Sequence, residues 1–308
     1  MRRLPKTPTV PRSEGHVQGA GARIWYETIG RGLPVLLLHG GPGADHTDFL
    51  PYLRPLARHC RLVLIDQRGS GHSERLADKT RYHLDYMVED LEALRRNLKI
   101  KQWVVLGHSF GGILAQAYAV RHPRRLAGLV LAGTASSAKS VDSDFRKILR
   151  GARATQRARL RALERAGIFK PSGEYTPAYA ALSARVLSAY MHAKPPPARA
   201  RDAPPIATEV VREMWSARSY FLIHGNLKGF DFTRRLRALD APVLIVIGDR
   251  DIVTPASAEL TRRACRRATL VVMAECAHMM FVDQTQQFNE LLLSFIRGCA
   301  RECRLKSP

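Results

Sequence analysis

The chain has 308 residues, of which 45% are hydrophobic and 25% are charged. This composition is ordinary for a globular protein and excludes extensive disorder. The formal net charge of +22 suggests an anionic partner, but the arginines are scattered and no block of Lys and Arg alternates with aromatic residues. We therefore expect no specific nucleic-acid partner. No apolar run reaches the roughly eighteen residues that a membrane-spanning helix needs, so we expect no membrane partner either.

The five cysteines are odd in number and irregularly spaced. No CxxC pair or histidine partner completes a zinc-site pattern, so no metal is expected. Reduced thiols in a cytoplasmic protein are the default interpretation of such a set.

The chain opens with residues 1–15, which we predict to be a flexible tail because three prolines and few apolar residues lie between Met1 and Glu14. From His16 to Gly30, polar and apolar residues alternate around two glycines. That pattern predicts a β-hairpin leading into a sheet.

Short apolar runs then alternate with helical stretches along the chain. The predicted strands are Pro34–Gly40, Arg61–Gly69, Trp103–Ser109, Ala127–Gly133, Pro242–Asp249 and Ala268–Met273. The predicted helices between them are Leu84–Leu98, Phe110–Arg121, Pro255–Arg266 and Thr285–Ile296. Continuous Val, Ile and Leu runs indicate strands that are covered on both faces. The alternation predicts an α/β protein whose mostly parallel sheet has helices on both faces.

The alternation stops between residues 136 and 231, where the spacing is helical and no strand run occurs. We predict that 136–231 form a helical cap, or lid, inserted into a core made of 16–135 and 232–300. The proline clusters of Lys194–Pro205 are interpreted as hinges. The arginine-rich run Arg146–Arg165 is interpreted as a solvated helix face, because its leucines have helical spacing. Ligands of open α/β sheets bind at the carboxyl edge of the strands, where such a cap would shape the pocket.

The strongest chemical signal is the G-x-S-x-G motif in "GHSFGG", with Ser109 at its centre. The motif follows a strand run and precedes a helical run, which is the context of a nucleophile elbow. Gly107 and Gly111 flank a turn so sharp that only small residues fit, and the first N–H groups of the following helix point at developing negative charge. The alternative is a chance match on an ordinary turn.

A serine nucleophile needs a base and a residue that orients the base. His278 lies after the last strand run, and Asp251 follows the strand that ends at Gly248. The order serine, acid, histidine is that of the nucleophile-elbow hydrolases. Asp249 is the competing acid. We favour Asp251, because two intervening residues after Gly248 let the chain turn back toward the histidine.

The segment "HGGPG", His39 to Gly43, follows the first parallel strand. We predict that the N–H groups of Gly41 and Phe110 form the oxyanion hole; the alternative is a tight turn without a catalytic role. His39 is expected to position its loop, and His108 is expected to point away from the nucleophile and pack. Arg68, in "DQRGSGHS", is expected to fix loop geometry.

The segments "HGGPG", "DQRGSGHS", "GHSFGG", "GDRDIVTP" and "CAHMMFVDQTQQFNELLLSFI" together resemble the proline iminopeptidase family of α/β-hydrolases. That family includes prolyl aminopeptidases and amino-acid amidases. The resemblance extends from about His16 to Ile296 and implies the α/β-hydrolase fold with a cap and no cofactor. It implies the triad roles for Ser109, Asp251 and His278, and an oxyanion hole at Gly41 and Phe110.

The sequence departs from this family where aminopeptidases hold the substrate's amine with acidic residues. The matching positions are Tyr220 in the cap and Ile252 after the triad acid, and neither is acidic. Glu209 and Glu213 lie one helical turn apart nearby and are the candidate substitutes. The alternative for both is an exposed helix face.

Two activities follow from these observations, each with a small-molecule or short-peptide substrate. The family motifs favour an aminopeptidase or amidase that acts through an acyl-enzyme. The missing acidic residues favour the alternative, a carboxylesterase or lactonase with an apolar acyl pocket, since a fold does not fix a function. A basic binding protein without activity is a third class, and the ordered Ser, Asp and His set argues against it.

Overall fold

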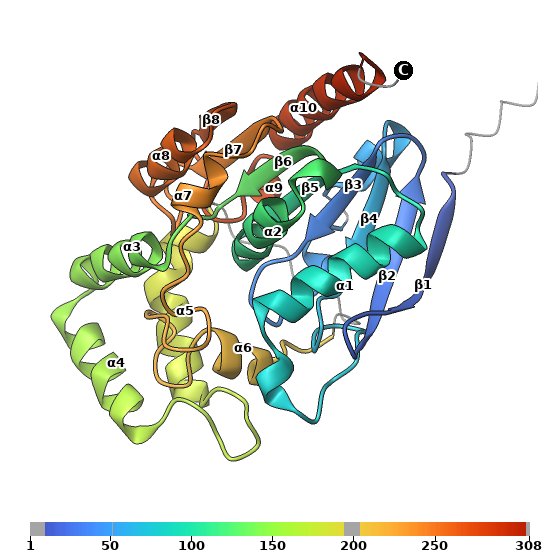
Figure 1. Ribbon diagram of the computed structural model, residues 1–308. Coiled ribbons are helices and arrows are strands. Elements are labelled where there is room, and N and C mark those ends of the chain that lie inside the picture. The colour runs from blue at the N-terminus through green and yellow to red at the C-terminus, as the bar shows by residue number, and fades with distance from the viewer. Residues whose placement is uncertain (1–9, 51, 194–203, 306–308) are drawn as a thin grey trace, which may run out of the picture.

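A central sheet of eight strands organises the molecule, and the computed structural model describes residues 10–50, 52–193 and 204–305 (Figure 1). The strand order is β1-β2-β4-β3-β5-β6-β7-β8. The strands are β1 (Arg12–Gln18), β2 (Arg23–Gly30), β3 (Pro34–Leu38), β4 (Arg61–Ile65), β5 (Trp103–His108), β6 (Leu126–Ala132), β7 (Val243–Gly248) and β8 (Ala268–Met273). β1 and β2 are antiparallel, and the other six strands run parallel to one another. The predicted α/β architecture and the predicted hairpin are confirmed.

Continuous apolar strand runs arise because both faces of the sheet are covered. In β3, Leu36 belongs to one hydrophobic core, whereas its neighbours Val35 and Leu37 belong to the other. The first core includes α1 (Leu84–Asn97), α2 (Phe110–Arg121) and α8 (Pro255–Ala264), and the second includes α9 (Met280–Asp283) and α10 (Thr285–Leu305). Side chains that alternate between two dry faces must all be apolar.

Two predicted boundaries change in the structure. Part of the predicted tail is a strand, because Arg12–Gly15 pair with Tyr26–Ile29 in β1; residues 1–9 lie outside the described residues. Helix α10 continues past the predicted end at Ile296, because buried Cys299 extends its apolar face by another turn.

The predicted cap, residues 136–231, contains α3 (Ala138–Gly151), α4 (Ala154–Ala166), α5 (Pro177–Met191) and α6 (Thr208–Met214), and α7 (Thr233–Leu236) follows it. These four helices lie together on one side of the sheet (Figure 1). The ends of the insertion are joined by hydrogen bonds from Ala138 N to Phe230 O and from Phe232 N to Ser136 O, each 2.9 Å. The division into 16–135, 136–231 and 232–300 stays a prediction, which these contacts support. Most of the proposed proline hinge, residues 194–203, lies outside the described residues.

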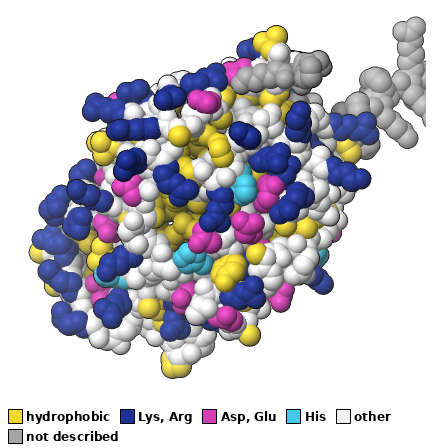
Figure 2. All heavy atoms as spheres, in the orientation of Figure 1, with side chains coloured by type: hydrophobic (Ala, Val, Ile, Leu, Met, Phe, Trp, Pro, Cys, Tyr) yellow, Lys and Arg dark blue, Asp and Glu magenta, His cyan; other side chains and the backbone are white. Residues whose placement is uncertain are grey.

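Short 3-10 helices punctuate the loops at His46–Asp48, Arg54–Arg58, Lys79–Arg81 and Pro123–Arg125. Basic side chains are spread over the face shown in Figure 2, with acidic side chains between them, and they are densest beside α3 and α4. This matches the helix-face interpretation of Arg146–Arg165, whose residues lie in those two helices and the turn between them.

Candidate active site

Ser109 stands at a strained turn between β5 and α2. Its φ of 54° and ψ of −120° are values that residues other than glycine rarely adopt. Ser109 N donates to Ala132 O at 2.9 Å, and Ser109 O accepts from Gly112 N at 2.9 Å, so the surrounding main chain holds the turn in place. Strain of this kind costs of order 1–3 kcal/mol and is concentrated at functional sites.

Close backbone contacts explain the glycines around Ser109. A Cβ on Gly107 would lie 2.2 Å from Gly111 O, and a Cβ on Gly111 would lie 2.0 Å from Leu38 O. Neither contact can be relieved by a side-chain movement, because the obstructing atoms belong to the backbone. Glycine is therefore required at both positions, because β5, α2 and β3 approach one another closely at this turn.

His278 and Asp251 form a buried pair on the loops after β8 and β7. Nδ1 of His278 lies 2.6 Å from Oδ1 of Asp251, and the two residues are only 5% and 4% exposed. Asp251 Oδ1 also accepts from Val253 N at 3.0 Å, which fixes the carboxylate. The structure records no hydrogen bond between His278 and the Ser109 hydroxyl. Such contacts are often long without substrate and tighten in the complex.

Asp249, the competing acid, makes different contacts. Its Oδ2 accepts from Glu275 N at 3.0 Å and its Oδ1 from Cys276 N at 3.1 Å. It thus holds the loop that carries His278, while Asp251 reaches the imidazole itself. The geometry favours Asp251 as the orienting acid.

The loop of His39–Gly43 lies against Ser109. A Cβ on Gly40 would be 3.3 Å from Ser109 Cβ. Gly41 has a φ of 110° and would place a Cβ 2.7 Å from Gly43 N, so no other residue fits there. Phe110 is the first residue of α2, where its N–H has no acceptor within the helix. The oxyanion roles of Gly41 and Phe110 stay predictions.

His39 is buried and fixes the neighbouring loop, as expected. Its Nε2 accepts from Gln67 N at 3.1 Å, so Nδ1 carries the proton and donates to Gly40 O at 3.0 Å. Burial lowers the pKa of His39, which keeps the ring neutral. Arg68 also matches its expected structural role, because its guanidinium is completely buried and makes two 2.8 Å bonds to Asp90.

His108 has a contact that its sequence position did not reveal. Its Nε2 lies 2.9 Å from the carbonyl oxygen of His278, and the two rings are 4.7 Å apart. A carbonyl only accepts, so Nε2 carries the proton. Burial first, and then the nearby His278, lower the pKa of His108 to about 3. This neutral ring packs beneath the predicted base and holds its main chain.

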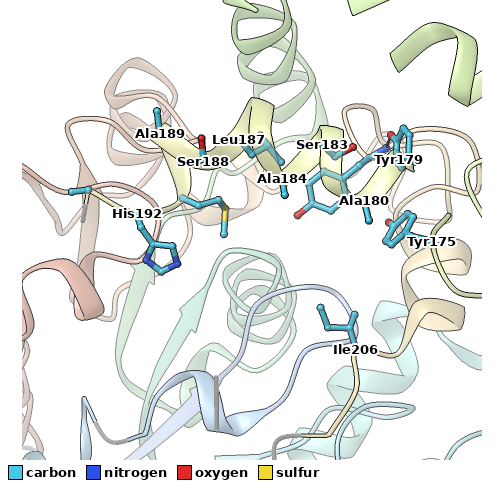
Figure 3. Close-up of a pocket in the computed structure, with 13 residues that line it drawn as sticks. Tyr175, Tyr179, Ala180, Ser183, Ala184, Leu187, Ser188, Ala189, His192 and Ile206 are labelled. Carbon is cyan, nitrogen blue, oxygen red and sulfur yellow. Dashed lines mark hydrogen bonds between the residues drawn. The ribbon is translucent and has the colours of Figure 1, made fainter. Parts of the chain in front are cut away.

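A cavity of about 750 Å³ lies beneath α5 (Figure 3). Tyr175 and Tyr179 lie toward one end of it, His192 lies at the other, and Ile206 faces α5 from the opposite side. Among the described residues, its wall contains no carboxylate, lysine or arginine. Burial lowers the pKa of His192, so this ring is neutral at pH 7 as well.

Of the predicted substrate-binding residues, one lines this cavity and the other two do not. Tyr220 lines it, and burial raises the pKa of its phenol. Glu209 lies outside the lining and pairs with Arg75 at 2.7 Å. Glu213 is half-buried and also lies outside the lining. Ile252 is a core residue that is 5% exposed. The substrate-binding roles of the two glutamates and Tyr220 stay predictions.

Within the described residues, no group of three or more His, Cys, Asp or Glu side chains is arranged to hold a metal ion. Among the same residues, no helix is long and apolar enough to span a membrane.

Comparison with known proteins reveals the relatives of this chain. A family profile described as "alpha/beta hydrolase fold" matches residues 34–285. A protein from Saccharolobus solfataricus named proline iminopeptidase is 30% identical over 291 residues, which cover 92% of this chain and 92% of that protein.

Two solved structures share the fold. The proline iminopeptidase of Mycobacterium smegmatis aligns with a TM-score of 0.80 at 23% identity, covering 94% of this chain and all of the other. Est816, described as an enzyme that degrades N-acyl homoserine lactones, aligns with a TM-score of 0.63 at 22% identity, covering 91% of this chain and all of the other. At these identities the structures establish the fold alone. The matched profile and the sequence relative show that the chain belongs to the α/β-hydrolase family and, within it, to the group of the proline iminopeptidases.

Proposed function

We propose that this serine hydrolase uses Ser109 as nucleophile, His278 as general base and Asp251 as the residue that orients the base. The observation that carries the proposal is the buried 2.6 Å contact between His278 and Asp251. Because Nδ1 faces Asp251, Nε2 is the atom left to accept the serine proton. The strained turn at Ser109 supports the same assignment.

The reaction proceeds through an acyl-enzyme. His278 Nε2 takes the hydroxyl proton as Ser109 Oγ bonds to the substrate carbonyl carbon, and the carbonyl oxygen becomes negative. The N–H groups of Gly41 and Phe110 stabilise that oxygen. The bond to the leaving group then breaks as His278 returns the proton to the leaving group. His278 then takes a proton from water as the water oxygen bonds to the acyl carbon, and it returns that proton to Ser109 Oγ as the bond between Oγ and the acyl carbon breaks and the acid leaves.

We place the substrate among amides with a free amino terminus, from which a single residue is released. The support is the name shared by the sequence relatives that match nearly the whole chain. A small-molecule or short-peptide substrate and the expected cytoplasmic location are parts of this proposal.

Ester or lactone hydrolysis is the second candidate, and the cavity beneath α5 favours it. An ammonium group that is buried without a carboxylate partner is costly. No carboxylate lines this cavity among the described residues, whereas tyrosines and aliphatic side chains do. An uncharged, apolar acyl group fits such a wall.

The test compares prolyl and alanyl arylamides, each with a free and a blocked amine, with short-chain p-nitrophenyl esters. Ser109→Ala is the control. Faster cleavage of the free-amine arylamides than of the blocked ones supports the aminopeptidase proposal. Turnover of esters alone supports the second candidate, and turnover that survives in Ser109→Ala excludes both.

A further inference from the structure

The end of α5 runs beside the loop that carries His278. His278 N donates to Tyr190 O at 2.9 Å, and Met279 N donates to Met191 O at 3.1 Å. A segment of the predicted cap is thus bonded directly to the residue proposed as the base and to the residue that follows it.

Asp283 completes this contact from the last residue of α9. Its Oδ2 accepts from Ala277 N at 2.9 Å and from Ala193 N at 3.0 Å. Its Oδ1 lies 3.9 Å from Nδ1 of His192. One donor belongs to the loop of His278 and the other, Ala193, lies two residues after the end of α5, so a single carboxylate oxygen joins the two segments.

The carboxylate of this bridge is buried from solvent, so its hydrogen-bond donors matter for stability. The Asp283 side chain is only 1% exposed. A carboxylate removed from water to this degree is stable only while donors surround it. Separating the end of α5 from the loop would leave Asp283 with one fewer donor, so the two segments favour the docked arrangement.

Three further contacts hold His278 in place. Asp251 holds the ring, Tyr190 holds the main-chain N–H, and His108 holds the main-chain carbonyl. Ala277, which Asp283 holds, immediately precedes His278. We propose that Asp283 is a positioning residue that fastens the end of α5 to the His278 loop and thereby sets the orientation of the base.

This inference rests on the proposed role of His278, and it adds a link between that role and the cavity. Met191 and His192 line the cavity, and the same short segment provides the main-chain acceptor for Met279 and the donor for Asp283. A group that displaces this segment would therefore also displace the base.

The experiment is a double-mutant cycle with Asp283→Asn and Ala193→Pro. The first variant removes the charge that both donors share, and the second removes only the donor at the end of α5. Asp249→Asn is the matched control, because Asp249 bonds two N–H groups of the same loop. The readouts are kcat and KM for p-nitrophenyl acetate and the downfield proton resonance of His278 Nδ1–H. Thermal unfolding of each variant separates loss of fold from loss of position.

Each of the two cycle variants is expected to lower kcat about 10- to 100-fold with little change in KM, because small misplacements of a base cost that much. The double variant should be no slower than Asp283→Asn within about twofold, since both changes break one bridge. The downfield resonance should shift or broaden more in the cycle variants than in Asp249→Asn, which leaves the contact between Asp283 and Ala193 intact.

Additive losses of kcat, or an unchanged kcat and resonance in Asp283→Asn, would overturn the inference. The resonance is read without substrate, so it reports the Asp251–His278 contact even if the proposed reaction is wrong. Failure of the proposed function would instead appear as turnover that survives in Ser109→Ala.

Discussion

Oδ1 of Asp251 and Nδ1 of His278 lie 2.6 Å apart, although the two residues come from loops after different strands. β7 and β8 are parallel neighbours, so their carboxyl ends bring both loops to one edge of the sheet. The contact occupies Nδ1 of His278 and leaves Nε2 as the nitrogen available to Ser109, the proposed nucleophile. It is the geometric centre of the proposed mechanism.

Asp251→Asn should lower kcat by about 10³- to 10⁴-fold, because an amide no longer favours the required tautomer or stabilises the imidazolium. Steady-state kinetics on the best substrate measures this. Asp249→Asn should cost far less, since Asp249 contacts two main-chain N–H groups and the Arg250 guanidinium rather than the imidazole of His278. If the losses in kcat were reversed between these two variants, Asp249 would be the orienting acid.

Ser109→Gly and Ser109→Ala should both be inactive but should differ in stability. Glycine adopts the φ of 54° without strain, whereas alanine keeps the strain. We expect the glycine variant to have the higher free energy of unfolding, by about 1 kcal/mol. Urea denaturation of the two variants measures the difference, and equal values would show that the turn stores no strain.

Protonation of buried His108 should contribute to acid unfolding. The pKa of His108 is lowered to about 3 from an ordinary value of 6.5, mainly by burial. Between these pH values the unfolded chain binds a proton that the native protein does not. Unfolding therefore takes up protons, and the free energy of unfolding falls as the pH drops from about 6.5 toward 3.

His108→Gln should reduce the fall in the free energy of unfolding between about pH 6.5 and pH 3 by up to a few kcal/mol. The reason is that glutamine can donate to the same carbonyl but does not titrate. His59→Gln, at an exposed position, is the control. Denaturant unfolding at pH 4.5 and pH 7 measures both variants. A profile in His108→Gln as steep as in the unmodified protein would contradict the prediction.

Filling the cavity beneath α5 should discriminate among acyl groups if they occupy it. Ala184 lines the cavity, whereas Ala181 is an exposed residue of the same helix outside the lining. Ala184→Trp should lower kcat/KM for p-nitrophenyl hexanoate about tenfold relative to the acetate. Ala181→Trp should leave the ratio unchanged. Equal effects of the two tryptophans on this ratio would place the acyl group elsewhere.

Much of the fold was predictable because its signals are local. Apolar runs marked the parallel strands, and the motif around Ser109 marked the turn from β5 to α2 within a residue. The pairing of β1 from Arg12 was missed because an exposed edge strand carries little apolar pattern: only Val17 of its seven residues is buried.

The predicted site was less complete than the predicted fold. Asp251 and His278 could be selected because chain order and strand ends constrain them. The contacts of His108 and Asp283 could not be predicted, because each joins segments that are far apart in the chain. Neither contact leaves a mark on the hydrophobic pattern of the sequence. Likewise, the sequence placed Glu209 in the predicted cap but could not show that it pairs with Arg75 from another loop.

The most direct test of the central claim is to trap the acyl-enzyme. The protein is mixed rapidly with p-nitrophenyl acetate, quenched in acid and digested, and the acylated peptide is identified by mass spectrometry. The proposed mechanism predicts about one acetyl group per chain on Ser109, with neither label nor turnover in Ser109→Ala. An acetyl group on another residue that accounts for turnover, or undiminished turnover in Ser109→Ala, would contradict it.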